Sequence, residues 1–110
     1  MCLDFGFVMN GYIQVITTID TEEKANEIAE YLLGNKAAAC VQIIPISSKY
    51  KWKGKIESAM EWMCLIKGKD FDKIKKLIKE KHPYDVPEII EIPITKGSID
   101  YLKWIDEETC

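Results

Sequence analysis

Side chains that could bind a metal ion are few in this 110-residue chain, and they lie far apart in the sequence. His82 is the only histidine, and the stretch 82–88 (HPYDVPE) places an aromatic ring and carboxylates beside it. Cys40 and Cys64 add two thiols. Imidazole and thiolate ligands favour copper and zinc over magnesium. No two of these residues have the spacing of a metal motif, although an oligomer interface can repeat one ligand per chain.

A structural interpretation of the same residues stays open beside the chemical one. Proline disfavours the helical region for the residue before it, so we expect His82 to end a helix. Pro87 suits the first residue of a strand. Cys40 and Cys64 lie in apolar runs, where a cysteine packs as a small hydrophobe. On this view the stretch 82–88 is a stiff connector, although loops held by rigid elements often carry function.

Composition excludes several classes of function. The net charge is −3, and all 15 basic residues are lysine. Without arginine the chain lacks the usual bidentate clamp for phosphate and carboxylate, which argues against acyl-phosphate hydrolysis. The acidic balance gives no footprint for nucleic acid, and residues 18–21 (TIDT) are not a glycine-rich phosphate loop. No apolar run approaches the roughly 20 residues that span a bilayer. We therefore predict no nucleic-acid or membrane partner.

The four cysteines form no C-x-x-C pair, and we find no secretory signal. Reduced thiols and a cytoplasmic location are therefore expected. We expect residues 1–11 to be an N-terminal arm that is loosely held or lies upstream of a true start at Met9. Residues 12–110 should form a single domain, since this length suffices for one core.

Hydrophobic periodicity and turn residues predict the elements that must position these side chains. They are a strand over 12–19, a helix over 21–34, strands over 38–52 and 55–67, a helix over 70–81, a strand over 88–94, and a short C-terminal helix capped by Ser98. We expect Asp20 to cap the first helix, and Asp70 or Lys69 to open the second. Pro45 should interrupt its strand at a sheet edge or bulge, and Lys53-Gly54 should form a tight turn.

The helices have predicted inward faces at helical spacing. The first uses Ala25, Ile28, Ala29, Leu32 and Leu33; the second uses Phe71, Ile74, Leu77 and Ile78; the last uses Ile99, Leu102 and Ile105. The strand over 55–67 is apolar on both faces at its centre, which is typical of a strand covered on both sides.

The element order β-α-β-β-α-β predicts an α+β, ferredoxin-like fold: an antiparallel sheet with two helices on one face. The hairpin over 38–67 exceeds the ordinary strand length of about 3–10 residues. We therefore predict that it reaches beyond the domain and pairs with other chains, because exposed edges of this length are usually covered.

Four motifs in this order resemble one known family. They are Ala38-Ala39-Cys40-Val41, the run 50–56 (YKWKGKI), Leu65-Ile66-Lys67, and the run 82–89 (HPYDVPEI). Together the chain resembles the CutA divalent-cation tolerance proteins over about residues 12–106. The resemblance implies a ferredoxin-like homotrimer, built by the long hairpins and similar to PII signalling proteins. Gln42 departs from the asparagine that the family often has.

The resemblance also implies the site residues. Cys40 and His82 match the family positions proposed to meet metal. Six more residues match the lining of an intersubunit cleft: Tyr50, Trp52, Glu61, Lys67, Tyr84 and Glu88. Of these, we predict Glu61 and Glu88 as further metal ligands, and the other four as cleft residues. Packing, a strand-face ion pair of Glu61 with Lys67, and an interface anchor at Tyr84 are the structural alternatives.

What the resemblance implies about function is a cytoplasmic, non-enzymatic trimer involved in tolerance of copper and other divalent cations. It would bind a divalent metal ion weakly at the intersubunit cleft, copper first and zinc second, with no organic cofactor. The alternative is a PII-like regulatory trimer that binds a small molecule or a partner protein in the same cleft, with metal incidental.

Overall fold

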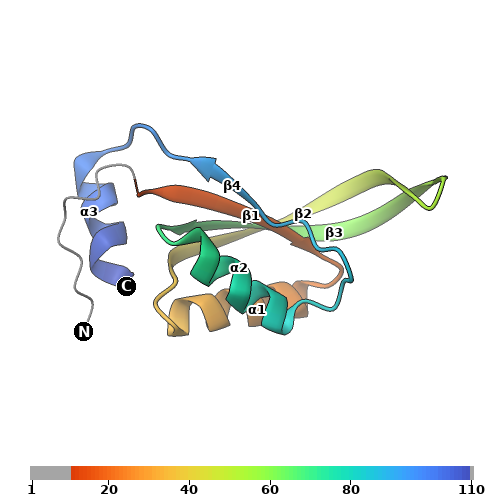
Figure 1. Cartoon of the computed structure of the whole chain (residues 1–110), viewed down its shortest axis with the longest axis horizontal. Helices are drawn as coiled ribbons and strands as arrows, with labels where there is room; N and C mark the ends of the chain where they lie inside the picture. Colours follow the sequence, from red (N-terminus) through yellow and green to blue (C-terminus); the bar gives the residue numbers. More distant parts are fainter. Residues whose placement is uncertain (1–10, 110) are drawn as a thin grey trace.

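A four-stranded sheet covered on one face by two helices forms the body of the molecule (Figure 1). The computed structural model describes residues 11–109. The elements are β1 (Ile13–Ile19), α1 (Glu22–Gly34), β2 (Ala38–Trp52), β3 (Lys55–Gly68), α2 (Phe71–Lys81), β4 (Ile90–Pro93) and α3 (Ile99–Glu108). The predicted element order is confirmed. The division into an arm over 1–11 and a domain over 12–110 stays a prediction, because residues 1–10 lie outside the described part.

The sheet has the strand order β2-β3-β1-β4, and all three pairings are antiparallel. β1 lies at the centre: Val15 pairs with Ile66 of β3 on one side and with Glu91 of β4 on the other. This is the predicted α+β, ferredoxin-like arrangement. The sheet therefore places the start of β4 and the middle of β3 on either side of β1.

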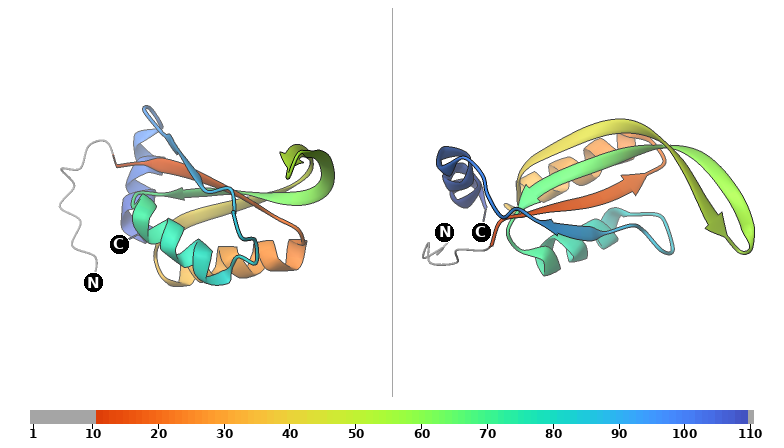
Figure 2. Two further views of the ribbon diagram at one scale, coloured as in Figure 1. Left: turned by 45° about the vertical axis from the view of Figure 1, so that its right-hand side comes forward. Right: turned by 90° about the horizontal axis from the view of Figure 1, so that it is seen from above.

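The β2–β3 hairpin projects far beyond the rest of the sheet (Figure 2). β2 and β3 pair as far as Trp52 and Lys55, whereas β1 reaches only to Trp62 of β3. The two-residue turn has positive φ at Lys53 (51°) and Gly54 (80°), and this backbone suits the twist of a hairpin. The molecule measures 48 × 25 × 21 Å as a result.

Pro45 does not interrupt β2, contrary to expectation. The strand runs through it, and Pro45 pairs with Trp62 in an unbroken register. β2 is an edge strand of the sheet, so the predicted edge position of Pro45 is confirmed. Proline is tolerated in an edge strand, where its missing N–H on the solvent side breaks no hydrogen bond of the sheet. The irregularity of the strand lies instead between Ala38 and Cys40.

The core lies between the sheet and the two helices. It contains Ile13, Val15 and Ile19 of β1, Ile28 and Leu32 of α1, Cys64 and Ile66 of β3, and Ile74, Leu77 and Ile78 of α2. Two predicted inward residues are exposed instead: Leu33 at 41% and Ile99 at 70%. Leu33 is the penultimate residue of α1, and Ile99 is the first residue of α3. Each lies where its helix leaves the surface it covers.

The helix caps match the sequence signals with one correction. Thr21, not Asp20, caps α1: its hydroxyl accepts a hydrogen bond from the Lys24 N–H at 3.1 Å. Asp20 instead pairs with the Lys24 ammonium at 3.4 Å. Asp70 caps α2 through the Lys73 N–H, and His82 ends that helix as predicted. Ser98 precedes α3 but makes no side-chain cap bond.

The last helix, α3, lies at the end of the molecule opposite the hairpin tip (Figure 1). Asp106 attaches it to the sheet: one carboxylate oxygen accepts a hydrogen bond from the Tyr12 hydroxyl at 2.5 Å, and the other pairs with Lys69 at 2.6 Å. Within the described range, no helix is long and apolar enough to cross a membrane.

Candidate functional site

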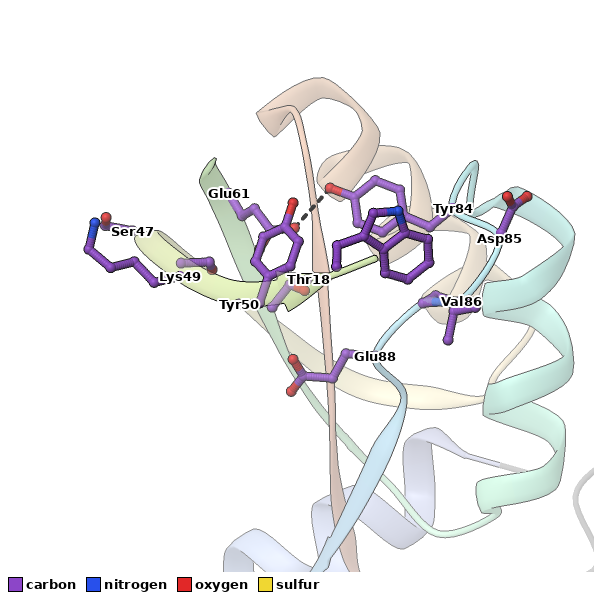
Figure 3. Close-up of a pocket in the computed structure, with 12 residues that line it drawn as sticks. Thr18, Ser47, Lys49, Tyr50, Glu61, Tyr84, Asp85, Val86 and Glu88 are labelled. Carbon is purple, nitrogen blue, oxygen red and sulfur yellow. Dashed lines mark hydrogen bonds between the residues drawn. The ribbon is translucent and has the colours of Figure 1, made fainter. Parts of the chain in front are cut away.

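A cavity of about 760 Å³ lies between the hairpin and the segment that joins α2 to β4 (Figure 3). Its walls come from three parts of the chain: the end of β1, the outer half of the hairpin, and the segment 84–88. The lining residues are Thr18, Ser47, Ser48, Lys49, Tyr50, Trp52, Glu61, Tyr84, Asp85, Val86, Pro87 and Glu88. This volume falls within the range of small-molecule sites, about 300–1,000 Å³.

A hydrogen bond joins Tyr84 and Glu61 in the wall of the cavity. The Tyr84 hydroxyl donates to Oε2 of Glu61 at 2.8 Å, as the dashed line in Figure 3 shows. Burial raises the pKa of Tyr84 well above its usual value, and the hydrogen bond to Glu61 and the negative charges of Glu61 and Asp20 raise it further. Tyr84 is therefore held as a neutral donor that faces a carboxylate.

His82 positions the cavity wall and does not line the cavity. Its Nδ1 accepts a hydrogen bond from the Tyr84 N–H at 3.2 Å, so the proton of the neutral ring lies on Nε2. That Nε2–H donates to the carbonyl of Thr18 at 2.8 Å. The His82 and Tyr84 rings meet edge to face, with centroids 4.6 Å apart. Both ring nitrogens are thus used to fix the segment 82–84 against β1.

The cavity is acidic on its inner side. Glu61 is 7% exposed, and Glu88 lines the same cavity in an exposed position. The carboxylate of Asp85 points away from the other lining side chains (Figure 3). Lys49 is the one lining cation in the described part of the chain, and its ammonium donates instead to the Ser58 hydroxyl at 3.1 Å. A ligand beside Glu61 therefore contacts a carboxylate, and no described lysine ammonium forms an ion pair with that carboxylate.

The structure brings five of the eight predicted site residues together around this cavity: Tyr50, Trp52, Glu61, Tyr84 and Glu88. The other three lie elsewhere. His82 stands behind Tyr84. Lys67 pairs with neither Glu61 nor any lining residue, and its ammonium donates to the Gln42 side chain at 3.0 Å.

Cys40, the third of these residues, does not line the cavity either. It is half-buried on β2, where it pairs with Lys67. Burial raises the pKa of Tyr101, and the Cys40 side chain beside that hydroxyl raises it further. Cys40 therefore faces α3. Cys64 is fully buried in the core, as the structural interpretation predicted.

The four predicted metal ligands do not fit a single ion within one chain. Across residues 11–109, no group of three or more His, Cys, Asp or Glu side chains is placed to hold a metal. The soft ligands that copper or zinc would select are engaged, with His82 bonded to backbone and Cys40 facing α3. Only the carboxylates of Glu61 and Glu88 share the cavity. The metal-site assignment stays a prediction.

Some lining residues carried no sequence signal. Thr18 enters the site because the β1–β3 register places it opposite Met63, near Glu61. Ser47 and Ser48 enter because they lie on the part of the hairpin that extends past the end of β1, facing the segment 84–88 across the cavity. The stretch 82–88 was already a candidate site in the sequence. It contains Asp85, Val86 and Pro87, so their position beside Tyr84 and Glu88 could have been predicted.

Comparison with known proteins gives a consistent set of relatives. A family model described as CutA1 divalent ion tolerance protein matches residues 13–108. The Divalent-cation tolerance protein CutA of Thermus thermophilus is 41% identical over 98 residues, which cover 86% of this chain and 95% of that protein. The Protein CutA, chloroplastic, of Arabidopsis thaliana is 38% identical over 100 residues, which cover 88% of this chain and 55% of that protein.

A solved structure has the same fold. The periplasmic divalent cation tolerance protein CutA from Archaeoglobus fulgidus superposes with a TM-score of 0.86 and is 39% identical. The match covers 88% of this chain and 97% of that chain.

Proposed function

Because the chain belongs to the CutA1 divalent ion tolerance family, we propose that it is a non-enzymatic homotrimer that acts in divalent-cation tolerance. The site that we assign to this role is the cavity beside Glu61. One observation carries this assignment: a carboxylate that is 7% exposed faces a cavity and forms no ion pair with another side chain in residues 11–109. Such a group favours a positively charged ligand.

The hairpin supports assembly into an oligomer. Large apolar side chains that do not line the cavity stand exposed along it: Ile44, Ile56 and Met60, with Ile56 at 75%. They lie on a two-stranded ribbon that has no third strand beside it beyond Trp62. Such a ribbon is only marginally stable alone and exposes a long edge, so pairing with other copies would stabilise it. We propose that three copies meet through these hairpins.

In the metal part of the proposal, copper is the first candidate and zinc the second. Glu61 and Glu88 are the ligands that one chain presents together. Cys40 and His82 stay predicted ligands. His82 would have to give up a hydrogen bond to a backbone group before either of its nitrogens could bind a metal.

Calorimetric titration with copper and with zinc tests the metal part, on protein whose native mass is measured first and under anaerobic conditions without reducing agent. We expect saturable binding that Glu61→Gln abolishes and that Glu27→Gln, an exposed charge-matched control on α1, leaves unchanged. His82→Ala and Cys40→Ala are titrated beside them. Loss in His82→Ala with retention in Glu61→Gln would move the site to His82. Absence of saturable binding would contradict metal binding.

A second candidate is a regulatory trimer of the PII-like kind that binds a small molecule in the same cavity. The cavity volume and its aromatic side chains Tyr50, Trp52 and Tyr84 favour this alternative, since an ion alone would leave most of the space unfilled. A thermal-shift screen of metabolites tests it, because a ligand that binds the native state raises the apparent melting temperature.

We propose a cytoplasmic location from the expectation of reduced cysteines. The names of the relatives include a chloroplastic protein and a periplasmic one. Cell fractionation of the native host tests this location directly.

A further inference from the structure

Glu61 is the most unusual charged group in the described part of the chain. It is 7% exposed, and Tyr84, a neutral donor, is its hydrogen-bond partner through Oε2. No described side chain donates a hydrogen bond to Oε1. A buried carboxylate without a countercharge is costly, and proteins normally pair such a group or bring it a cation. Among the described residues, Thr17 Oγ1 is the one buried side-chain oxygen without a hydrogen-bond partner, so Oε1 of Glu61 is open to the cavity, where it can accept from a ligand.

The chain's own lysines near the cavity are used elsewhere. Lys49 lines the cavity but donates to Ser58, and Lys67 on the strand of Glu61 donates to Gln42. Among residues 11–109, the two ion pairs are those of Lys24 with Asp20 and of Lys69 with Asp106. No described lysine therefore pairs with Glu61, and a positive charge beside it would have to come from outside residues 11–109.

The walls of the cavity define what kind of cation fits. Three aromatic side chains, Tyr50, Trp52 and Tyr84, line it together with Glu61. Aromatic faces attract ammonium groups and pack well against apolar bodies. The free oxygen of Glu61 calls for an N–H donor, which a primary ammonium group supplies and a quaternary one does not.

We propose that the cavity binds a primary ammonium group, which donates to the carboxylate of Glu61 while the attached body packs against the aromatic walls. The exposed carboxylate of Glu88 adds a second, weaker attraction at the entrance. A volume of about 760 Å³ accepts a ligand with a sizeable apolar or aromatic body. This assignment goes beyond the metal role proposed above and competes with it for Glu61, so both are tested on the same variants.

A metal ion fits the same space less well. Hard cations need about six oxygen ligands, and soft ones need thiolate or imidazole. The cavity offers Glu61 and Glu88, while Asp85 points away and His82 is bonded to backbone. An ammonium group needs one carboxylate and neighbouring aromatic side chains, and the cavity presents Glu61 together with Tyr50, Trp52 and Tyr84.

Two sources could supply the ammonium group: a small-molecule amine, or a lysine from a second copy of this chain in the assembly. The chemistry at Glu61 is the same in both cases. The experiment uses three probes that share one aromatic body and differ in charge: phenethylammonium, phenethyl alcohol and 3-phenylpropionate. Each is titrated calorimetrically into the full chain in metal-free buffer that contains a chelator.

Four proteins are compared: wild type, Glu61→Gln, Glu88→Gln and the distant control Glu27→Gln. Glutamine keeps the shape of Glu61 and can still accept the Tyr84 hydrogen bond, so the change removes mainly the charge. Glu88 is exposed, so Glu88→Gln keeps the test valid even if Glu61→Gln fails to fold. Circular dichroism checks each variant before titration.

A small-molecule source predicts saturable binding of phenethylammonium at one per chain, at least tenfold tighter than the other two probes. Glu61→Gln should weaken it at least tenfold, Glu88→Gln should weaken it to a smaller extent, and Glu27→Gln should leave it unchanged. A lysine source predicts no probe binding to wild type, a carbodiimide cross-link between Glu61 and a lysine of another copy, and weaker assembly of Glu61→Gln.

Equal binding of the three probes, ammonium binding that both cavity variants retain, or neither binding nor cross-link would overturn the proposal. Copper or zinc titrations are run on the same four proteins. If metal binding fails while phenethylammonium binds, only the metal role is contradicted. If metal binds through Glu61 and the ammonium probe does not, only the ammonium site is contradicted, provided that no Glu61 cross-link to another copy forms.

Discussion

The Tyr84 hydroxyl donates a 2.8 Å hydrogen bond to Glu61, and this contact joins the segment after α2 to the middle of β3. Twenty-three residues separate the two in sequence. The partner of this bond is a carboxylate, and it is buried. The pair therefore fixes the segment after α2 against β3 in the wall of the cavity and carries the charge that we assign to ligand binding.

Tyr84→Phe should destabilise the protein by about 1–3 kcal/mol, because it leaves a buried carboxylate without its donor. Tyr50→Phe is the matched control. It removes a hydroxyl from the same cavity, and that hydroxyl donates no hydrogen bond to another described residue. Urea unfolding at neutral pH measures both. Equal midpoints for the two variants would contradict the importance of the Tyr84 bond.

The pH dependence of stability should show the same contact. The pKa of Tyr84 is raised in the folded state, whereas an unfolded tyrosine titrates near 10. Above about pH 10 the native state holds the proton that the unfolded state has lost, so this contribution is complete below that pH and declines as the pH rises. In Tyr84→Phe, the free energy of unfolding should fall less steeply as the pH rises above about 10. In Tyr50→Phe, the steepness should stay closer to that of the wild type. Urea midpoints measured from about pH 8 to about pH 11 check the slopes.

Cys64 and Cys40 should differ sharply in reactivity. Burial raises the pKa of the Cys64 thiol to about 11, and its side chain is fully buried, whereas Cys40 is half-buried. Iodoacetamide at about pH 8 should modify Cys40 well before Cys64 in native protein, because the thiolate is the reactive form. Peptide mass spectrometry reports each site. The same reaction in denaturant gives the reference rates of the two exposed thiols. Modification of both cysteines at one rate in native protein would contradict the burial of Cys64.

Asp106→Asn should loosen α3 from the sheet. The carboxylate accepts from Tyr12 and pairs with the largely buried Lys69, and a hydrogen bond to a charged group contributes about 1.5–3 kcal/mol. Hydrogen exchange of residues 99–108 should increase, while exchange of β1 and β3 stays slow. Glu107→Gln changes a neighbouring exposed charge and should have little effect. Faster exchange in both variants alike would contradict an anchor at Asp106.

Gly68→Ala and Gly34→Ala should have opposite effects. A Cβ at Gly68 would lie 2.6 Å from the Ala37 carbonyl oxygen and 2.9 Å from Ile74 Cδ1, so backbone must shift, at a cost of about 1–3 kcal/mol. A Cβ at Gly34 meets nothing within 4 Å, and the less flexible unfolded chain should stabilise by up to about 1 kcal/mol. Urea unfolding of both variants measures the difference. A neutral Gly68→Ala would show that the β3–α2 junction is looser than described.

The sequence predicted the framework because its local signals agree with the fold. His82 ends α2 where the following proline demands it, and Lys53-Gly54 turns the hairpin where two positive φ values are needed. The predicted site residues Tyr50, Glu61 and Tyr84 meet because the hairpin register and the end of α2 bring them to one place. Spacing predicted the elements, whereas the resemblance to the CutA family implied the grouping of the site residues.

What the sequence could not show was how each polar group is used. His82 looks like a ligand in a list of residue types, yet both ring nitrogens bond to backbone groups of β1 and of the following segment. Lys67 shares a strand with Glu61 but bonds across to Gln42. These choices depend on tertiary distances that the sequence does not contain. Thr21 replaced Asp20 as cap for a similar reason, since both residue types suit the position.

The long hairpin gives the cavity two walls of unequal stiffness. Ser47 to Trp52 pair only with Lys55 to Met60, on a ribbon two strands wide, whereas the opposite wall rests on β1 and on the segment that His82 locks in place. The width of the cavity is therefore set by how far a compliant ribbon bends toward a rigid base. Because one continuous ladder links the cavity to the hairpin tip, a ligand that bends the ribbon also moves the surface by which we propose that the copies assemble.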